Sequence, residues 1–97
     1  MSFTPQTSTA ALVASTVTTV DIPANVDTLE VGSIDGSAAI WYTLDGSTPT
    51  VGGAACYLLP AVIGSRLHNL AASTEADVKV KLISAGTPTY FTTAEIH

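Results

Sequence analysis

The side chains that could perform catalysis in this chain are few and far apart. Two histidines, His68 and His97, and a single cysteine, Cys56, are the candidates for a nucleophilic or metal-binding site. The histidines are separated by 29 positions, which matches no metal-ligand spacing, and no third group is evident that could orient a base. Cys56 lies between Ala55 and Tyr57 in an apolar run, which favours a small buried hydrophobe over a nucleophile.

The eight acidic residues are scattered along the chain, mostly in expected turns or at the rims of strands. A pair of catalytic carboxylates must lie about 5 to 9.5 Å apart across a cleft, and nothing in the sequence indicates a cleft. Calcium held by Asp27, Asp35 or Asp45 at sheet-end loops is the alternative to solvated carboxylates. The favoured interpretation is a protein that is not an enzyme and has no catalytic, cofactor-binding or metal-binding residue.

The stretch from residue 39 to residue 50 predicts a strand that runs directly into a tight turn. Residues 39–44 alternate between two faces and include the aromatic and β-branched types that fit a pleated surface. In the turn, Asp45 can accept hydrogen bonds from the N–H groups that follow it, Gly46 tolerates a positive φ, and Pro49 cannot donate to a ladder. We expect Asp45, Gly46 and Pro49 to be structural turn residues.

The adjacent aromatic residues Trp41 and Tyr42 could be part of a sugar-stacking platform. Neighbouring residues of a strand point to opposite faces, so only one of the two can lie on such a platform and the other belongs to the core. A structural role is therefore favoured over sugar binding. Trp41 is also a candidate residue for a protein interface.

Short apolar segments bounded by turn residues continue along the chain. Asp35-Gly36 is a hairpin signal, and the segment from Gly64 to Leu70 fits either a strand edge or irregular structure. The other expected strands cover residues 7–22 with a break, 28–31, 39–44, 55–59, 77–84 and 89–96. This pattern predicts an all-β fold, an immunoglobulin-like β-sandwich of about six or seven antiparallel strands.

The clearest of these strands covers residues 77–84, where Val78, Val80 and Leu82 are expected to face inward. Lys79 and Lys81 alternate with them and are expected to face solvent, where they also protect against edge pairing.

Charged residues make up only 11% of the chain, against about 25% in an average domain, and hydrophobic residues make up 46%. Most of the surface must therefore be small and neutral or apolar, and such surfaces associate readily. The net charge is −5, with three basic residues, and these cannot form the basic face that nucleic acid or an anionic membrane requires. No apolar run approaches the ~20 residues that span a bilayer. Other polypeptides are the expected partners.

The chain of 97 residues has the length of one domain. We expect an N-terminal arm over residues 1–9, rich in Thr, Ser and Gln, and a single sandwich domain over residues 10–97. The arm lacks a secretory signal, which favours folding in a cytoplasm, and the lone cysteine agrees with this. Phe3 and Pro5 in the arm are candidate contacts with a neighbouring subunit.

Residues 40–84 resemble the immunoglobulin-like domain at the carboxyl end of chitobiases and β-hexosaminidases. The resemblance is carried by Tyr42-Thr43-Leu44-Asp45-Gly46-Ser47-Thr48-Pro49-Thr50, followed by Tyr57, Pro60 and the strand Val78-Lys79-Val80-Lys81. In that family the domain is an accessory module, so the resemblance implies the fold and little about activity.

In its length, acidity and content of Thr, Ala and Gly, the chain also resembles the small β-sandwich proteins that tailed bacteriophages place on their virions. That resemblance implies a virion structural protein, assembled in the host cytoplasm. The expected role is a head decoration or minor capsid protein that binds and cements major capsid subunits, copies of itself, or both. A tail component and a carbohydrate-binding accessory module are the alternatives.

Overall fold

A computed structural model of the chain describes the backbone of residues 4–22, 26–69 and 78–96. The described residues form strands and no helix, and every strand pair is antiparallel, which confirms the all-β class. The strands of this part of the chain are β1 (Thr4–Ala11), β2 (Thr18–Ile22), β3 (Val26–Ser33), β4 (Ile40–Thr43), β5 (Tyr57–Leu59), β6 (Gly64–Asn69), β7 (Val78–Ile83) and β8 (Thr89–Ile96).

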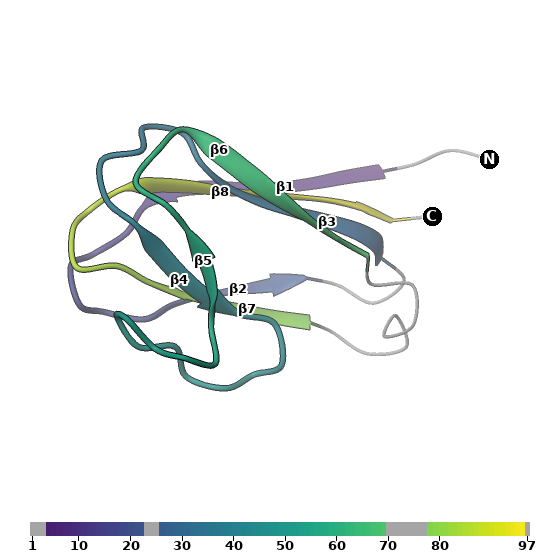
Figure 1. Cartoon of the computed structure of the whole chain (residues 1–97). Helices are drawn as coiled ribbons and strands as arrows, with labels where there is room; N and C mark the ends of the chain where they lie inside the picture. Colours follow the sequence, from purple (N-terminus) through teal and green to yellow (C-terminus); the bar gives the residue numbers. More distant parts are fainter. Residues whose placement is uncertain (1–3, 23–25, 70–77, 97) are drawn as a thin grey trace.

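The strands form two four-stranded sheets, which face one another in Figure 1. One sheet has the order β1-β8-β3-β6 and the other the order β2-β7-β4-β5. A single apolar core lies between them and takes residues from both: Leu12, Ile22, Leu29, Val31, Ile40, Tyr42, Leu59, Val80, Leu82, Tyr90 and Ala94. The arrangement is that of a β-sandwich.

The expected alternation of side chains is confirmed in the strands that carry most of the core. In β4, Ile40 and Tyr42 are fully buried, whereas Trp41 between them is only partly buried. In β7, Val80 and Leu82 are fully buried, and Lys79 is exposed. A strand in the middle of a sheet buries one face against the opposite sheet. Because successive side chains point to opposite faces, every second residue of such a strand is buried.

Eight described strands replace the six or seven expected, for two reasons. The segment over residues 7–22 divides into β1 and β2, which lie in different sheets, because the chain crosses between the sheets over residues 12–17. The segment from Gly64, for which the sequence allowed either a strand edge or irregular structure, forms β6 at the edge of a sheet.

The expected boundary between an arm and the domain falls inside β1. Residues 4–9 are paired along β8, from Thr4 opposite Ile96 to Thr9 opposite Phe91. The Thr-rich sequence of this segment favours a strand, and the free edge of β8 supplies the partner. Residues 4–9 therefore form part of the first strand of the described fold.

The hairpin expected at Asp35-Gly36 is wrong, because β3 and β4 lie in different sheets. Gly36 has a φ of 61°, and a Cβ built on it would lie 2.6 Å from the carbonyl carbon of Val62. The Asp35 carboxylate accepts hydrogen bonds from the N–H groups of Ser37 and Thr89. A turn therefore does form at Asp35-Gly36. It belongs to the loop that carries the chain from one sheet to the other, and this loop contacts the connection between β5 and β6.

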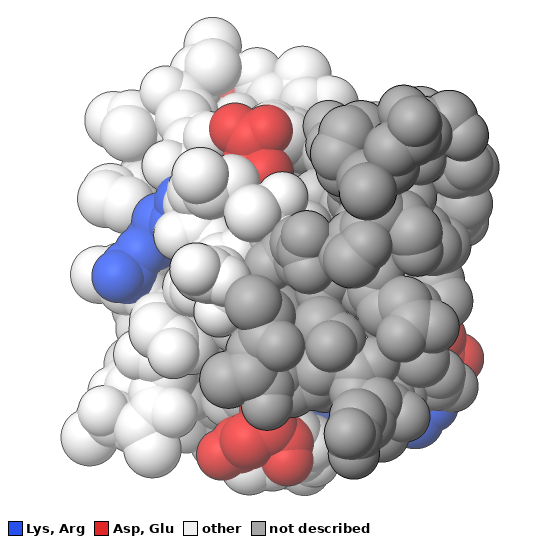
Figure 2. All heavy atoms as spheres, turned by 90° about the vertical axis from the view of Figure 1, so that its right-hand side faces the viewer, with Lys and Arg blue, Asp and Glu red and all other residues white. Residues whose placement is uncertain are grey.

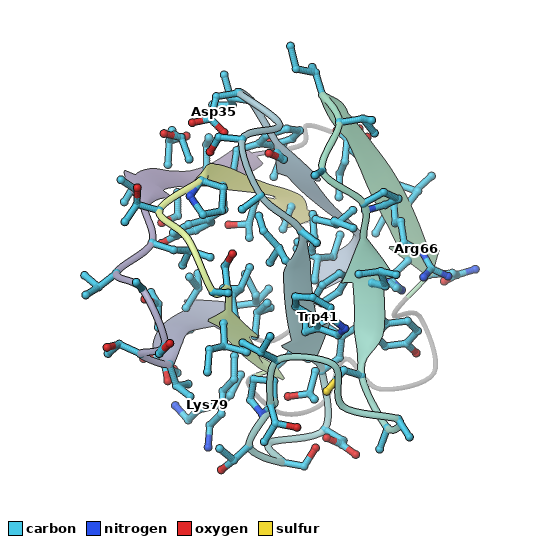
Figure 3. All side chains as sticks on the ribbon, turned by 60° about the vertical axis from the view of Figure 1, so that its left-hand side comes forward. Asp35, Trp41, Arg66 and Lys79 are labelled. Carbon is cyan, nitrogen blue, oxygen red and sulfur yellow. The ribbon has the colours of Figure 1, made fainter. Side chains whose placement is uncertain are left out.

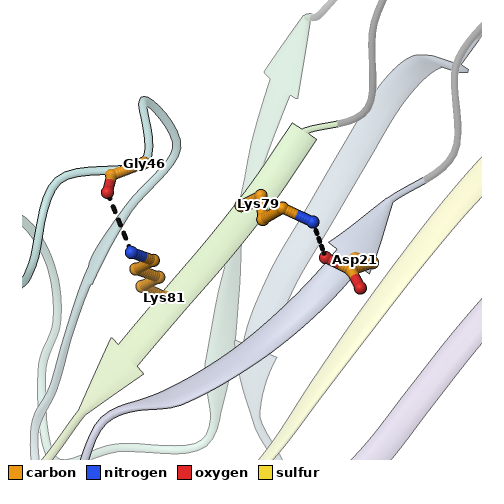
Figure 4. Close-up of polar contacts among 4 residues, drawn as sticks. All are labelled: Asp21, Gly46, Lys79 and Lys81. Carbon is orange, nitrogen blue, oxygen red and sulfur yellow. Dashed lines mark hydrogen bonds and ion pairs between the residues drawn. The ribbon is translucent and has the colours of Figure 1, made fainter.

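The lysines of β7 do not protect an edge, since β7 lies between β2 and β4. Lys79 forms an ion pair with Asp21 on the neighbouring β2, with Nζ 2.5 Å from Oδ1. Lys81 donates a hydrogen bond of 3.0 Å to the carbonyl oxygen of Gly46 in the β4–β5 loop (Figure 4). Both lysines therefore connect β7 to its neighbours across the outer face of the sheet.

Candidate functional site

The side of the sandwich on which β5 and β6 lie carries the candidate functional site. β5 is the edge strand of one sheet and β6 the edge strand of the other, and residues 60–63 connect them. We call this region, residues 57–69, the β5–β6 side. Figure 3 shows Arg66 of β6 at this outer margin, far from the charged residue Lys79. The β5–β6 side contains an aromatic cluster and an apolar surface.

The aromatic cluster consists of Tyr42, Tyr57, His68 and Arg66. The rings of Tyr42 and Tyr57 are stacked at 5.3 Å between centroids, and His68 lies edge-on to Tyr57 at 4.7 Å. The Tyr42 hydroxyl oxygen is 2.5 Å from Nε2 of His68, and Cζ of Arg66 is 5.2 Å from the centre of the Tyr57 ring. The Tyr57 ring contacts two rings and a guanidinium group, yet the residue is still 41% exposed.

Burial keeps both members of the hydrogen bond between Tyr42 and His68 uncharged at neutral pH. Desolvation raises the pKa of Tyr42 to about 12, although the charge of Arg66 opposes the shift. Desolvation, and then the charge of Arg66, lower the pKa of His68. In the tautomer with its proton on Nδ1, the neutral imidazole accepts at Nε2 the hydrogen bond that the Tyr42 hydroxyl donates. The Nε2 lone pair is then occupied, so His68 is not placed as a free general base.

A groove of about 540 Å³ lies beside this cluster, and both Cys56 and His68 line it. Cys56 is half-buried and not fully enclosed, which corrects the expectation of a buried thiol in a buried strand. The reason is that residues 55 and 56 precede β5, and β5 is an edge strand whose Tyr57 and Leu58 are 41% and 42% exposed. The hydrogen bonds found among the described residues do not join Cys56 to a base.

The apolar surface consists of four large side chains that protrude into solvent. Leu58 is 42% exposed, Val62 60%, Ile63 74% and Leu67 72%. Leu58 and Val62 also line a second groove, of about 330 Å³, together with Pro60. Leu58, opposite Trp41, lies on the outer face of the β2-β7-β4-β5 sheet, and Leu67, opposite Glu30, lies on the outer face of the other sheet, so these side chains flank the β5–β6 side on both faces. Exposed apolar side chains of this size, close together in one part of the chain, are typical of contact surfaces.

Charge is nearly absent from this side. Within residues 57–69, Arg66 is the only residue with a formal charge at neutral pH, given the lowered pKa of His68. The nearest carboxylate in the sheet is Glu30 on β3, which accepts a hydrogen bond of 2.6 Å from the Ser65 hydroxyl. Figure 2 faces the right-hand side of Figure 1, where red and blue side chains stand apart from one another among white atoms.

Of the three candidate interface residues, the structure describes the side chain of Trp41. Trp41 lies on the outer face of its sheet, in register with Leu58 on β5 and with Ile83 on β7, and so borders the apolar surface without entering the aromatic cluster. Phe3 lies outside the described residues, and for Pro5 the description is limited to its backbone, opposite Glu95 in β8.

The turn residues behave as expected from their types. Asp45 Oδ1 accepts hydrogen bonds from the N–H and the hydroxyl of Ser47, and these bonds, the hydroxyl first, lower the pKa of Asp45. Gly46 has a φ of 85°, and Pro49 is buried. Asp45 also borders the larger groove.

Asp35 and Asp45 are each tied to local donors and lie in different loops. Within the described residues, no group of three His, Cys, Asp or Glu side chains is placed to hold a metal ion. Asp27, the third candidate calcium ligand, has a side chain outside the described set. No helix of the described part is long and apolar enough to cross a membrane.

The residues of the β5–β6 side were not singled out by the sequence, apart from Tyr57, Pro60 and His68. Two signals could have found them. Val62 and Ile63 form an apolar pair between Pro60 and Gly64, where a turn should be polar, and Leu67 stands in a segment without core periodicity.

Comparison of the chain with protein-family models, with curated proteins and with solved structures finds no match in any of the three.

Proposed function

We propose that this chain is a non-catalytic binding protein that docks on other polypeptides through its β5–β6 side. The observation that carries the proposal is that Leu58, Val62, Ile63 and Leu67, each more than two-fifths exposed, all belong to two edge strands and their connection, a segment with a single formal charge. Burial of one such side chain contributes about 1.5–3 kcal/mol, so four of them are enough to anchor a contact.

The proposed setting is the virion of a tailed bacteriophage, and the fold is proposed to be immunoglobulin-like. Support comes from the turn motif around Asp45, from the small acidic chain with few charges, and from the β-sandwich architecture. In this setting the chain decorates the head and cements major capsid subunits, in contact with copies of itself or with the capsid protein. A subunit that touches several neighbours gains affinity through effective concentration, even when each contact is modest. The alternative position is a tail component.

Immunogold labelling of particles tests the setting. Antibodies raised against the chain are expected to label the heads of the tailed phage whose genome encodes it. Labelling confined to the tail would favour the tail component, and the absence of label on heads and tails would overturn the virion assignment. Glycan-array binding that is lost in Trp41→Ala would instead support the carbohydrate-binding alternative.

Substitution of the apolar surface tests the docking. The double variant Val62→Asp, Ile63→Asp places two carboxylates on the apolar surface. We expect purified particles to lack this variant under conditions in which they incorporate the unchanged chain. Val13→Asp is the matched control, because Val13 is 62% exposed but lies between β1 and β2. Equal incorporation of the double variant and the control would contradict docking through this side.

A further inference from the structure

Arg66 is a cation that the described fold leaves without an acidic partner. The other two basic residues are engaged in the opposite sheet, Lys79 with the Asp21 carboxylate and Lys81 with the carbonyl oxygen of Gly46. Among the described residues, no carboxylate lies within ion-pair distance of Arg66, although the chain has eight acidic residues and three basic ones. An arginine left unpaired in so acidic a chain is available to a carboxylate from outside.

The register of β6 explains why the acidic residue beside it does not pair with Arg66. Glu30 of β3 is in register with Leu67, whereas Arg66 is in register with the fully buried Val31. Neighbouring residues of a strand point to opposite faces, so Glu30 lies on the outer face of the sheet and Arg66 starts from the inner face. At the margin of the sandwich the Arg66 side chain reaches solvent (Figure 3). The fold therefore separates this cation from the carboxylate on the neighbouring strand.

Tyr57 restricts the position of the guanidinium group. Cζ of Arg66 lies 5.2 Å from the centre of the Tyr57 ring, and that ring is stacked on the fully buried Tyr42. A cation–π contact does not require the five N–H donors of the guanidinium group as hydrogen-bond donors, so they can bind a carboxylate with two parallel hydrogen bonds. Because the group is already positioned, less side-chain entropy is lost when a carboxylate binds.

An apolar groove of about 330 Å³ begins beside Arg66. Leu58, Leu59, Pro60 and Val62 supply most of its lining. Leu59 is only 3% exposed and belongs to the core, whereas Val62 is 60% exposed. Ligand sites usually have volumes of about 300–1,000 Å³, so this groove is at the small end of the range and suits a single apolar side chain. One positioned cation therefore lies at a groove whose other large side chains are apolar.

We propose that this groove recognises an acidic residue of the partner polypeptide together with an apolar side chain close to it. Arg66 binds the carboxylate, and the groove takes the apolar side chain. The inference rests on the proposed function, because it gives the chemistry of the segment that docks on the β5–β6 side. Ile63, which is 74% exposed, extends the apolar area beyond the groove, and this favours a polypeptide segment over a small molecule.

The charges around the groove support an acidic partner. Residues 57–69 include no carboxylate, so no acidic side chain of that segment repels an incoming acid. The net charge of −5 opposes the approach of an acid from afar, but salt largely screens this repulsion beyond about 8 Å under physiological conditions. A basic segment would instead meet the like charge of Arg66 without a carboxylate of residues 57–69 to compensate. The groove is therefore expected to select acidic segments and to reject basic ones.

Binding of two short peptides tests this recognition. The first is a capped peptide with the sequence alanine-leucine-alanine-glutamate-alanine, in which leucine and glutamate lie on the same side of an extended chain. The second has glutamine in place of glutamate. We expect the glutamate peptide to bind the unchanged chain about tenfold more tightly, because hydrogen bonds between ionised groups are the stronger ones. Chemical shifts of the backbone amides of residues 58–66 measure both affinities. Equal binding of the two peptides, or no binding of the glutamate peptide at about 10 mM, would overturn the inference.

Two variants assign the preference to Arg66. Arg66→Gln should bind the two peptides equally, and thermal unfolding checks that it remains folded, as the exposure of this side chain predicts. Lys81→Gln is the matched control, because it removes the same charge from the outer face of the other sheet, and it should keep the preference for glutamate. A preference that survives Arg66→Gln, or that Lys81→Gln also abolishes, would contradict recognition by Arg66.

The two proposals fail separately. An Arg66-dependent preference for glutamate, in a chain whose Val62→Asp, Ile63→Asp variant enters particles as readily as Val13→Asp, would support the recognition site and overturn docking through this side in the virion. Loss of that double variant from particles, together with equal binding of the two peptides, would leave the docking standing and overturn the recognition of an acidic residue.

Discussion

The two sides of the sandwich that end in edge strands differ in the residues that they expose. On the side of β1 and β2, the surface carries the Asp21–Lys79 ion pair and small hydroxyl side chains. On the side of β5 and β6, the surface carries Leu58, Leu67 and a single charge. A chain with three basic residues cannot protect every edge with charge. Because the chain has few charges, the β5–β6 side is left without charged protection and is available for contact. A partner should therefore be sought on that side.

The largest expected effect is a difference in stability loss between a leucine of the core and a leucine of the apolar surface. Leu29 on β3 is fully buried and Leu67 on the adjacent β6 is 72% exposed. Leu29→Ala should lower the free energy of unfolding by about 2–5 kcal/mol, because it leaves a cavity. Leu67→Ala should change it by less than about 0.5 kcal/mol in dilute solution. Urea unfolding measures both, and similar losses would show that Leu67 supports the fold of the monomer rather than a contact.

A glycine holds the crossing loop against the β5–β6 side. Gly36→Ala forces a non-glycine residue to a φ of 61° and drives its Cβ to 2.6 Å from the backbone of Val62, so a loss of about 2 kcal/mol or more is expected. Gly46→Ala is the control, since its φ is 85° but no heavy atom lies within 4 Å of its Cβ. Thermal unfolding should show a smaller loss there, and equal losses would mean that the contact with Val62 contributes nothing.

As the pH falls, the β5–β6 side should lose stability at a higher pH than the turns that contain Asp35 and Asp45. The folded pKa of His68 is lowered from 6.5, so the stability that its neutral form contributes is fully present above that value and is lost as pH falls from there towards the folded pKa. The carboxyls of Asp35 and Asp45 have pKa values lowered from 3.8, so their contributions are lost only below that value.

Urea midpoints at pH 7.5 and pH 5 check this separation. The unchanged chain should lose stability between the two values, by about 1 kcal/mol or less because His68 is partly exposed. His68→Gln should lose clearly less. An equal loss in both proteins would assign the acid sensitivity to other groups.

The smallest effect concerns the protected side. Asp21→Asn removes an ion pair whose side chains are 50% and 66% exposed, so the expected loss is under about 1 kcal/mol and should shrink in high salt. Unfolding in low and high salt measures it. A larger, salt-independent loss would mean that charge stabilises this side far more than an exposed pair can.

The sequence predicted the parts of the fold in which a local pattern and the tertiary environment agree. The strand around Val80 and the strand with its turn around Tyr42 and Asp45 both have one face buried by the opposite sheet, so alternation was visible. The hairpin at Asp35-Gly36 was wrong because a turn signal fixes the local chain reversal and not the sheet that the next strand joins.

The candidate site escaped prediction because edges obey weaker rules than cores. β6 places Arg66 and His68 in register with the buried residues Val31 and Leu29, yet at the margin of the sandwich these positions reach solvent and tolerate polar side chains. The alternation that identifies a central strand is therefore absent, and the exposed Leu67 looks like noise in a single sequence.

The pairing of the first strand with the last has a consequence for how the molecule is made. β1 aligns with β8 along its full length, from Thr4 opposite Ile96 to Ala11 opposite Thr89. One sheet cannot close until β8 has left the ribosome, about 80 residues after β1, so nascent β1 must wait as an uncharged, β-prone segment. Slow closure and sensitivity to crowded translation are the expected costs of pairing β1 with β8.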